Sequence, residues 1–241
     1  MKILVETDSV RLSLLGTGTD TLFVAFTGVG QGLGGIQTEE FIGTASRGNK
    51  SALFVIDKKR SWYNEPDVMS EALFHYKRIR TELNARRTVA LGNSMGGFGA
   101  ILFSGLANID AAIAFSPQFS VHPDIVPQEN RWKEYRKQIG RFLYKDLSSS
   151  FRHETRYYIF NGDAPEEEMH FSHFPQRPNV TNIVFPGCYH EVARMLKTDA
   201  RLSELISLCA EGATAAVQAL CVQRYGAYVH APPQYPTELA R

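Results

Sequence analysis

Short apolar runs alternate along most of the chain with longer segments of helical period. The six runs expected as strands, rich in β-branched and aromatic residues, are 21–28, 51–58, 88–94, 111–117, 157–163 and 181–187. Several are apolar on both faces, which is typical of strands covered by helices on both sides. Two earlier runs, Ile3 to Val5 and Val10 to Leu15, predict an opening hairpin.

The segment 66–83, between two of these runs, predicts a helix. Pro66 suits a first helical position, and one apolar stripe is traced by Val68, Ala72, Tyr76, Ile79 and Leu83. Strands that alternate with helices favour an α/β fold with a mostly parallel, doubly wound sheet and right-handed crossovers. With no internal repeat and no linker, we expect a single domain over residues 1–241.

Two stretches depart from this alternation. Residues 118–156 are too long for a bare connection and predict a small helical cap or lid insertion. The basic residues expected on its helix are Arg131, Lys133, Arg136, Lys137, Arg141 and Lys145. The Pro-rich end, residues 230–241, predicts a loosely held tail.

Composition narrows the classes of function. Hydrophobic residues make up 44% of the 241 and charged residues 21%, as in an ordinary globular protein. A formal net charge of +1 argues against a nucleic-acid partner. Charges interrupt residues 1–16, unlike a signal peptide, and no apolar run is long enough to span a bilayer. Three cysteines without metal-type spacing fit the cytoplasm; the oligomeric state stays open.

The stretch LGNSMGGFGA, 91–100, places Ser94 between an expected strand and an expected helix, Met95 to Leu106. Gly92 and Gly96 complete the pattern Gly-x-Ser-x-Gly, in which glycines prevent collisions around a sharply turned nucleophile. The Met95 amide, opening the helix, would then donate to an anion. A plain glycine-rich turn and a phosphate loop are the alternatives, although no lysine follows the glycines.

On these residues the chain resembles the α/β-hydrolase superfamily over most of 20–200. The resemblance implies a nucleophilic serine followed by an acid and a histidine, each after a strand. Asp163 follows one expected strand as the predicted acid, and His190 follows the next as the base. It implies no metal and no organic cofactor.

Each of these residues has rivals. Asp163 could instead cap the helix that begins near Pro165, and Asp57 and Glu191 are other carboxylates at strand ends or beside the histidine. His170 and His173 could line the site or bind a metal, although HxxH alone is weak evidence. His75 is read as a surface or packing residue.

The oxyanion hole needs a second donor besides Met95. It should come from the loop after 21–26, where the resemblance favours the Val29 amide, with Gly28 as the alternative. Thr27-Gly28 stands where many members carry His-Gly, so the internal bonding of this loop is open. A nucleotide-binding loop is the competing interpretation, but Leu33 breaks GxGxxG.

Substrate contacts are expected from other strand ends. Trp62 and Tyr63 could wall a pocket or staple their loop to the next helix, and Gln118 could reach the site. The basic residues of 118–156 fit either an anionic substrate group or a solvated face. The sequence therefore predicts a serine hydrolase of a small-molecule ester or thioester. Acyl transfer by the same residues and a non-catalytic scaffold remain the alternatives.

Overall fold

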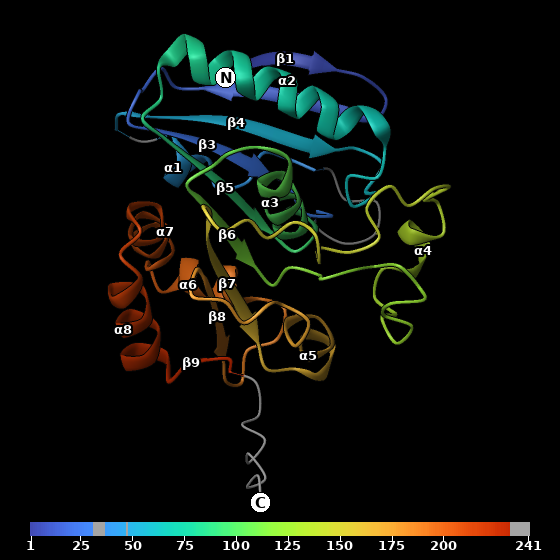
Figure 1. Ribbon diagram of the computed structural model, residues 1–241, viewed down its shortest axis with the longest axis vertical. Helices are drawn as coiled ribbons and strands as arrows, with labels where there is room; N and C mark the ends of the chain where they lie inside the picture. Colours follow the sequence, from blue (N-terminus) through green and yellow to red (C-terminus); the bar gives the residue numbers. More distant parts are fainter. Residues whose placement is uncertain (31–36, 47, 232–241) are drawn as a thin grey trace, which may run out of the picture.

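The computed structural model describes residues 1–30, 37–46 and 48–231. The expected tail at 230–241 therefore lies almost wholly outside the described residues, as do Gln31 to Gly35 of the glycine-rich loop. Within the described residues the chain builds one sheet flanked by helices on both faces (Figure 1).

The sheet has the order β1-β2-β4-β3-β5-β6-β7-β8-β9 among the described residues. The six central strands, in the order β4-β3-β5-β6-β7-β8, pair in parallel. At the two edges, β1 pairs antiparallel with β2, β2 with β4, and β9 with β8. The predicted opening hairpin and the predicted parallel sheet are confirmed. The strands are β1 (Lys2–Glu6), β2 (Val10–Leu15), β3 (Thr21–Phe26), β4 (Lys50–Asp57), β5 (Arg87–Asn93), β6 (Ala111–Phe115), β7 (Arg156–Gly162), β8 (Val180–Phe185) and β9 (Tyr228–Val229).

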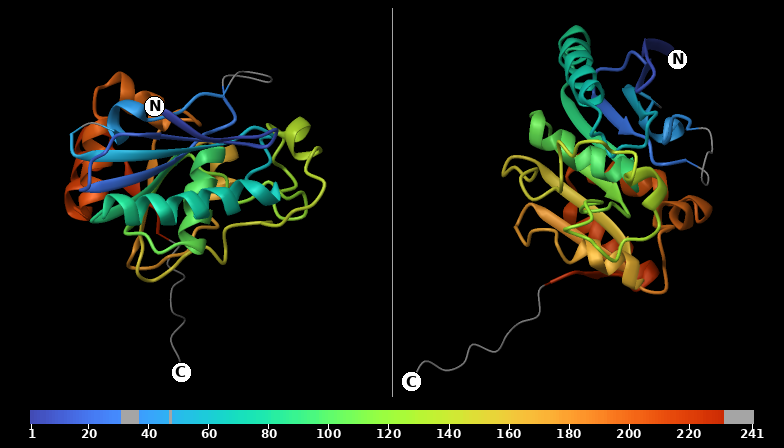
Figure 2. Two further views of the ribbon diagram at one scale, coloured as in Figure 1. Left: turned by 90° about the horizontal axis from the view of Figure 1, so that it is seen from above. Right: turned by 90° about the vertical axis from the view of Figure 1, so that its right-hand side faces the viewer.

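Helices cover both faces of the sheet and form two separate apolar cores. One core packs α2 and α3 against the sheet, and the other packs α1, α6, α7 and α8 against the opposite face (Figures 1 and 2). The helices are α1 (Ile42–Ala45), α2 (Pro66–Leu83), α3 (Met95–Leu106), α4 (Lys133–Arg136), α5 (Pro165–Phe171), α6 (Val192–Thr198), α7 (Leu202–Glu211) and α8 (Thr214–Tyr225). This double cover explains why the central strands are apolar on both faces.

Helix α2 has the predicted bounds. Pro66 opens it, and the stripe Val68, Ala72, Tyr76 and Ile79 is buried against the sheet. The helix ends where Asn84 takes a left-handed φ of 48°, at which its backbone N–H bonds to the last turn. Local signals and tertiary packing agree here, and so the prediction succeeds.

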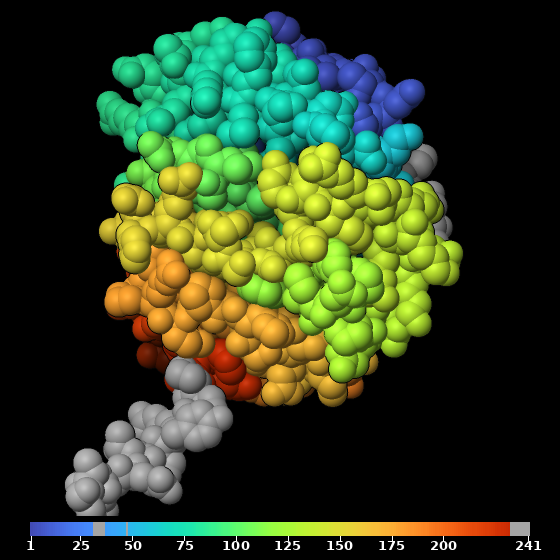
Figure 3. Space-filling view, turned by 45° about the vertical axis from the view of Figure 1, so that its right-hand side comes forward, coloured from blue at the N-terminus to red at the C-terminus, as the bar shows by residue number. Residues whose placement is uncertain are grey.

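The segment 118–156 is less helical than its charge pattern suggests. Only the four residues of α4 are helical, and Arg141 and Lys145 lie outside any helix, which corrects the expected basic helix. Gly140 follows α4, and the partly buried Phe142 and Tyr144 then pack against the core instead of continuing a helical stripe. Figure 3 shows the segment, in yellow-green to yellow, spread over the surface beside α3 and the orange region of α5.

Candidate active site

The turn between β5 and α3 is a strained, glycine-flanked elbow. Ser94 has φ 56° and ψ −123°, and its amide bonds to the Phe115 carbonyl at 2.8 Å. A Cβ on Gly92 would lie 2.0 Å from the Gly96 carbonyl oxygen, and one on Gly96 would lie 2.1 Å from the Phe26 carbonyl oxygen. Only glycine fits at either position, because backbone atoms cannot move aside as a flexible side chain can.

Ser94 and His190 meet at this edge of the sheet. Ser94 Oγ lies 2.8 Å from His190 Nε2, within hydrogen-bond distance. His190 comes from the loop after β8, which is held against the end of β7: the Asp163 amide bonds to the Cys188 carbonyl at 2.9 Å. A Cβ on Gly162 would lie 1.7 Å from that carbonyl oxygen, so glycine permits the close approach. These backbone contacts hold the loop that places the His190 imidazole beside Ser94.

The carboxylate beside His190 is Glu167, not Asp163 as predicted. Glu167 Oε1 lies 2.9 Å from His190 Nδ1, and the Glu167 side chain is 1% exposed. Asp163 instead accepts the Gly187 amide at 3.0 Å, and the residue preceding α5 is Ala164, so Asp163 fills neither predicted role. Burial opposes ionisation of Glu167, but its hydrogen bond to His190 and the charges of His190 and Arg131 hold its pKa below the ordinary value.

The sequence held only a weak signal for Glu167. It is the middle residue of a run of three glutamates in the first turn of α5, where acidic residues are favoured for the helix alone. What distinguishes Glu167 is burial, because the side chains on either side of it are exposed. Burial of one glutamate in such a run depends on how α5 docks, which the local sequence does not specify.

The loop after β3 lies opposite the elbow and is fixed from several sides. The Gly28 amide donates to Glu40 Oε1 at 3.3 Å, the Val29 carbonyl accepts Arg60 Nε at 2.7 Å, and the Thr27 carbonyl accepts the Tyr63 hydroxyl at 2.9 Å. Among the described residues neither the Val29 nor the Met95 amide has an acceptor. These two predicted donors are therefore available, whereas the alternative donor, Gly28, is already bonded.

The Gln118 side chain reaches Ser94, and Trp62 orients the Gln118 amide. Gln118 Nε2 lies 3.2 Å from Ser94 Oγ, and Gln118 Oε1 accepts Trp62 Nε1 at 3.1 Å. An indole N–H can only donate, so the oxygen of the amide must face Trp62 and its nitrogen must face Ser94. Ser94 Oγ consequently accepts from Gln118 while it donates to His190.

Trp132, from the segment 118–156, stands over the same site and was missed by the sequence analysis. Its ring centroid lies 6.2 Å from that of Trp62 and 6.1 Å from that of His190. Its indole nitrogen is buried without a partner in the described part of the chain.

Tyr63 and His170, both expected to contact substrate, are fully buried supports. The Tyr63 ring packs beside Phe26, under α3, where a Cβ on Gly99 would meet the ring at 2.4 Å. His170 is 1% exposed, and its two ring nitrogens bond to Glu129 and to the Phe119 amide. Neither side chain offers a free polar atom to a ligand.

Asp57 and His75, the other titratable residues considered from the sequence, are buried and have structural roles. Asp57 is completely buried and accepts the amides of Lys59, Ser61 and Tyr63, which ties down the turn carrying Trp62. Burial raises the pKa of Asp57 to about 6, against these hydrogen bonds. His75 is buried on α2, consistent with its reading as a packing residue. Within the described residues, no cluster of three or more His, Cys, Asp or Glu residues is arranged to hold a metal ion.

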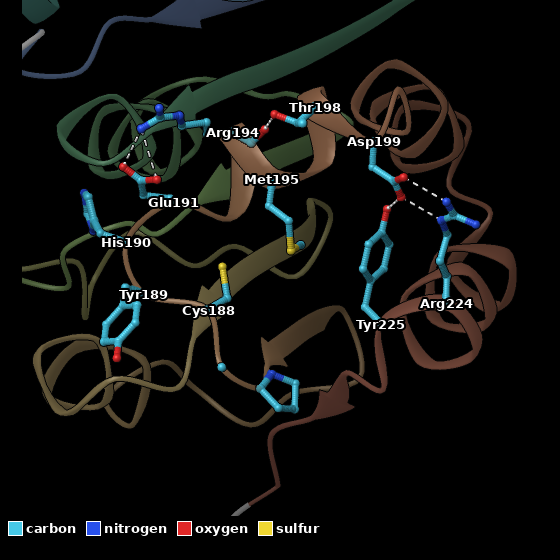
Figure 4. Close-up of a pocket in the computed structure, with 12 residues that line it drawn as sticks. Cys188, Tyr189, His190, Glu191, Arg194, Met195, Thr198, Asp199, Arg224 and Tyr225 are labelled. Carbon is cyan, nitrogen blue, oxygen red and sulfur yellow. Dashed lines mark hydrogen bonds and ion pairs between the residues drawn. The ribbon is translucent and has the colours of Figure 1, made fainter.

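A surface cavity of about 1250 Å³ lies on the far side of the His190 loop, between α6 and α8. Figure 4 places His190 at its rim, with the ring directed away from the Asp199–Arg224 pair. That pair and Tyr225 already satisfy one another through hydrogen bonds of 2.5 to 2.8 Å. Ser94 does not line this cavity, so we do not assign the acyl group to it.

Solved structures provide the relevant comparison. No family model and no curated protein sequence matches the chain. An α/β-hydrolase enzyme from the sediment metagenome of the Mar Chica lagoon is similar in structure, with a TM-score of 0.52, 15% identity and coverage of 86% of this chain and 98% of that one. The chain has the α/β-hydrolase fold.

Other α/β-hydrolase-fold structures extend the comparison. The fluorophosphonate-binding serine hydrolase FphF of Staphylococcus aureus gives a TM-score of 0.58 and 14% identity, covering 84% of this chain and 95% of that one. The capsule O-acetyltransferase of Neisseria meningitidis serogroup A also gives 0.58, with 17% identity and coverage of 86% and 93%. The α/β-hydrolase fold of this chain is therefore compatible with hydrolysis or acyl transfer.

In residues 1–30, 37–46 and 48–231, no helix combines the length and the apolar character needed to cross a bilayer.

Proposed function

We propose that the protein is a serine hydrolase that cleaves a small-molecule ester or thioester through an acyl-enzyme on Ser94. The observation that carries the proposal is the 2.8 Å contact between Ser94 Oγ and His190 Nε2 at a strained elbow. A serine hydroxyl is a weak nucleophile without an adjacent base, and strain at such a turn commonly serves function.

The reaction begins with proton transfer from Ser94 Oγ to His190 Nε2 as Oγ attacks the acyl carbonyl carbon. Glu167 holds the proton of His190 on Nδ1 and stabilises the imidazolium. The Met95 and Val29 amides donate to the oxyanion, while Gln118 holds Ser94 Oγ in place. His190 then protonates the departing oxygen or sulfur as its bond to the acyl carbon breaks.

Water completes the cycle. It gives a proton to His190 Nε2 and adds its oxygen to the acyl carbon, after which the bond to Ser94 Oγ breaks and Ser94 recovers the proton. No step uses a metal or an organic cofactor. Three unpaired cysteines suit a reducing compartment, so we place the enzyme in the cytoplasm.

Acyl transfer is the second candidate, since an acceptor hydroxyl can replace water in the same steps. The observation that favours it is the structural similarity to the capsule O-acetyltransferase, which has also been solved in complex with CoA. We propose that the same Ser94, His190 and Glu167 would serve either acceptor.

A fluorophosphonate probe tests both candidates. Ser94→Ala and His190→Ala should abolish labelling, whereas Ser148→Ala, at an exposed serine, should leave labelling unchanged. Turnover of p-nitrophenyl acetate or release of CoA from acetyl-CoA in water supports hydrolysis. Labelling without turnover until a hydroxyl acceptor is added supports transfer. A folded wild-type protein that is never labelled would leave only a scaffold role.

A further inference from the structure

A chain of buried charges continues behind Glu167 into the segment 118–156. Arg131 Nη1 donates to Glu167 Oε1, the same oxygen that accepts from His190. The other side of the Arg131 guanidinium donates to the Glu129 carboxylate. Arg131 Nε lies 3.1 Å from Glu129 Oε1 and 3.0 Å from Oε2, and Arg131 Nη2 lies 2.6 Å from Oε2. Glu129 is 1% exposed, and its Oε2 lies 2.9 Å from His170 Nε2.

The proton positions in this cluster follow from its hydrogen bonds. The Phe119 amide donates to His170 Nδ1, so the neutral ring carries its proton on Nε2. The Nε2–H then donates a hydrogen bond to the Glu129 carboxylate. Burial lowers the pKa of His170, in keeping with a neutral ring. Burial opposes ionisation of Glu129, but its bonds to His170 and Arg131 bring its pKa to about 2. Two carboxylates and one guanidinium leave the cluster with a single negative charge.

We infer that Arg131 and Glu129 are positioning residues, which fix the Glu167 carboxylate toward His190 and leave one uncompensated negative charge behind the imidazole. Neither residue touches the nucleophile. Without Arg131, two buried carboxylates would face each other, and one would take up a proton. Without the charge of Glu129, Arg131 would neutralise Glu167 and weaken its support of the imidazolium.

This assigns the segment 118–156 a task other than covering the substrate. The segment is also anchored at residues further along the chain than Arg131. The Tyr144 amide bonds to Asn64 Oδ1 at 2.8 Å, and Arg152 Nε bonds to the Gly105 carbonyl at 3.0 Å. Its docking therefore brings Arg131 to Glu167 from a separate part of the chain. The inference rests on the proposed function and concerns how its acid is held.

The test compares Arg131→Met, Arg131→Lys and Glu129→Gln with two controls on the same segment, Glu134→Gln and Lys137→Met. The control residues form an exposed ion pair at 3.0 Å. Kinetics with p-nitrophenyl acetate across pH, fluorophosphonate labelling rates and thermal unfolding are measured for each. Arg131→Met should lower kcat about 10- to 100-fold with KM changed less than about threefold, and Arg131→Lys should recover part of that loss.

Glu129→Gln should move the acidic limb of the kcat/KM profile to lower pH, since the cluster loses its net negative charge. Glu191 and Arg194, which follow His190 in the chain, pair with each other at the surface and are unchanged in this variant. The low-field proton resonance of His190 Nδ1–H gives a readout independent of turnover: it should shift in both the Arg131 and Glu129 variants. If Arg131→Met does not fold, Arg131→Lys and Glu129→Gln carry the test.

Profiles and resonances like those of the two controls would overturn the inference. Failure of the proposed function looks different, because the wild-type protein would then be neither labelled nor active while its His190 resonance still responded to Arg131 and Glu129.

Discussion

Glu167 Oε1 lies 2.9 Å from His190 Nδ1, whereas Asp163, four residues earlier, accepts the Gly187 amide at 3.0 Å. The two carboxylates therefore have different partners: Glu167 contacts the proposed base, and Asp163 holds the turn that follows β8. The proposed acid is the third residue of α5 and does not lie at the end of β7.

Exchange of these carboxylates for amides should separate the two tasks. Glu167→Gln keeps the shape of the side chain but removes its negative charge. If the amide NH₂ faces Nδ1, His190 is held in the tautomer that carries its proton on Nε2, so kcat should fall by roughly 10³- to 10⁴-fold. Asp163→Asn should keep kcat within about fivefold and lower the unfolding midpoint slightly, because the Gly187 amide can still bond to the amide oxygen. Steady-state kinetics on p-nitrophenyl acetate check both. A larger loss in Asp163→Asn than in Glu167→Gln would restore Asp163 as the acid.

The sequence was sufficient to predict those features for which a local sequence rule and the fold require the same residue. Gly92 is required by a backbone contact only four residues away, Gly96 belongs to the same short motif although its close contact is the Phe26 carbonyl of β3, and the Pro66 helix carries its own start and stripe. The order of strands then placed Ser94 and His190 at one sheet edge without any knowledge of side-chain packing.

The acid and the charged cluster behind it could not be predicted in this way. Asp163 occupies the position after a strand, but its carboxylate accepts a hydrogen bond from the Gly187 amide in the loop between β8 and α6. Glu129, Arg131 and Glu167 are separated by up to 38 positions in the chain and become partners only when the segment 118–156 docks. For the basic residues that include Arg131, the sequence left an anionic substrate group and a solvated face equally open, since a charge pattern does not record which members are buried.

A side chain at the elbow should cost most of the stability of the fold. Gly92→Ala would place its Cβ 2.0 Å from a backbone oxygen, so we expect a loss of about 3 kcal/mol or more in the free energy of unfolding, or no folded protein. Gly140→Ala is the matched control, because its Cβ would meet no atom within 4 Å. Urea unfolding followed by circular dichroism measures both. Equal stabilities would show that the elbow can relax.

Gln118 should act through the amide hydrogen that it gives to Ser94. Gln118→Ala removes this donor, and we expect kcat/KM to fall about 10- to 100-fold, within the range for loss of one hydrogen bond at the reacting centre. Trp62→Phe keeps Gln118 but removes the indole donor that orients it, so a smaller loss should follow. In the double variant the two losses should be less than additive, because both act on one amide. Additive losses would mean that Trp62 and Gln118 act separately.

The carboxyl of Glu40 should make stability fall as pH rises toward neutrality. Burial raises its pKa to about 7, against the opposing hydrogen bond from the Gly28 amide, and its Oε2 is buried without a partner among the described residues. The folded state therefore keeps a proton that the unfolded chain releases above its ordinary pKa of 4.5. The cost to folding grows between about pH 4.5 and 7 and is constant above that range.

Glu40→Gln removes this titration. Its free energy of unfolding relative to the native chain should rise by no more than about 3 kcal/mol between pH 5 and pH 8. Urea unfolding at four pH values measures the difference, with Glu154→Gln, at an exposed glutamate, as the control. The same substitution should preserve activity below pH 7 and raise it above, because an ionised Glu40, bonded to the Gly28 amide of the same loop as Val29, would oppose the proposed oxyanion. A stability difference that shrinks as pH rises would mean that Glu40 is held ionised by the fold.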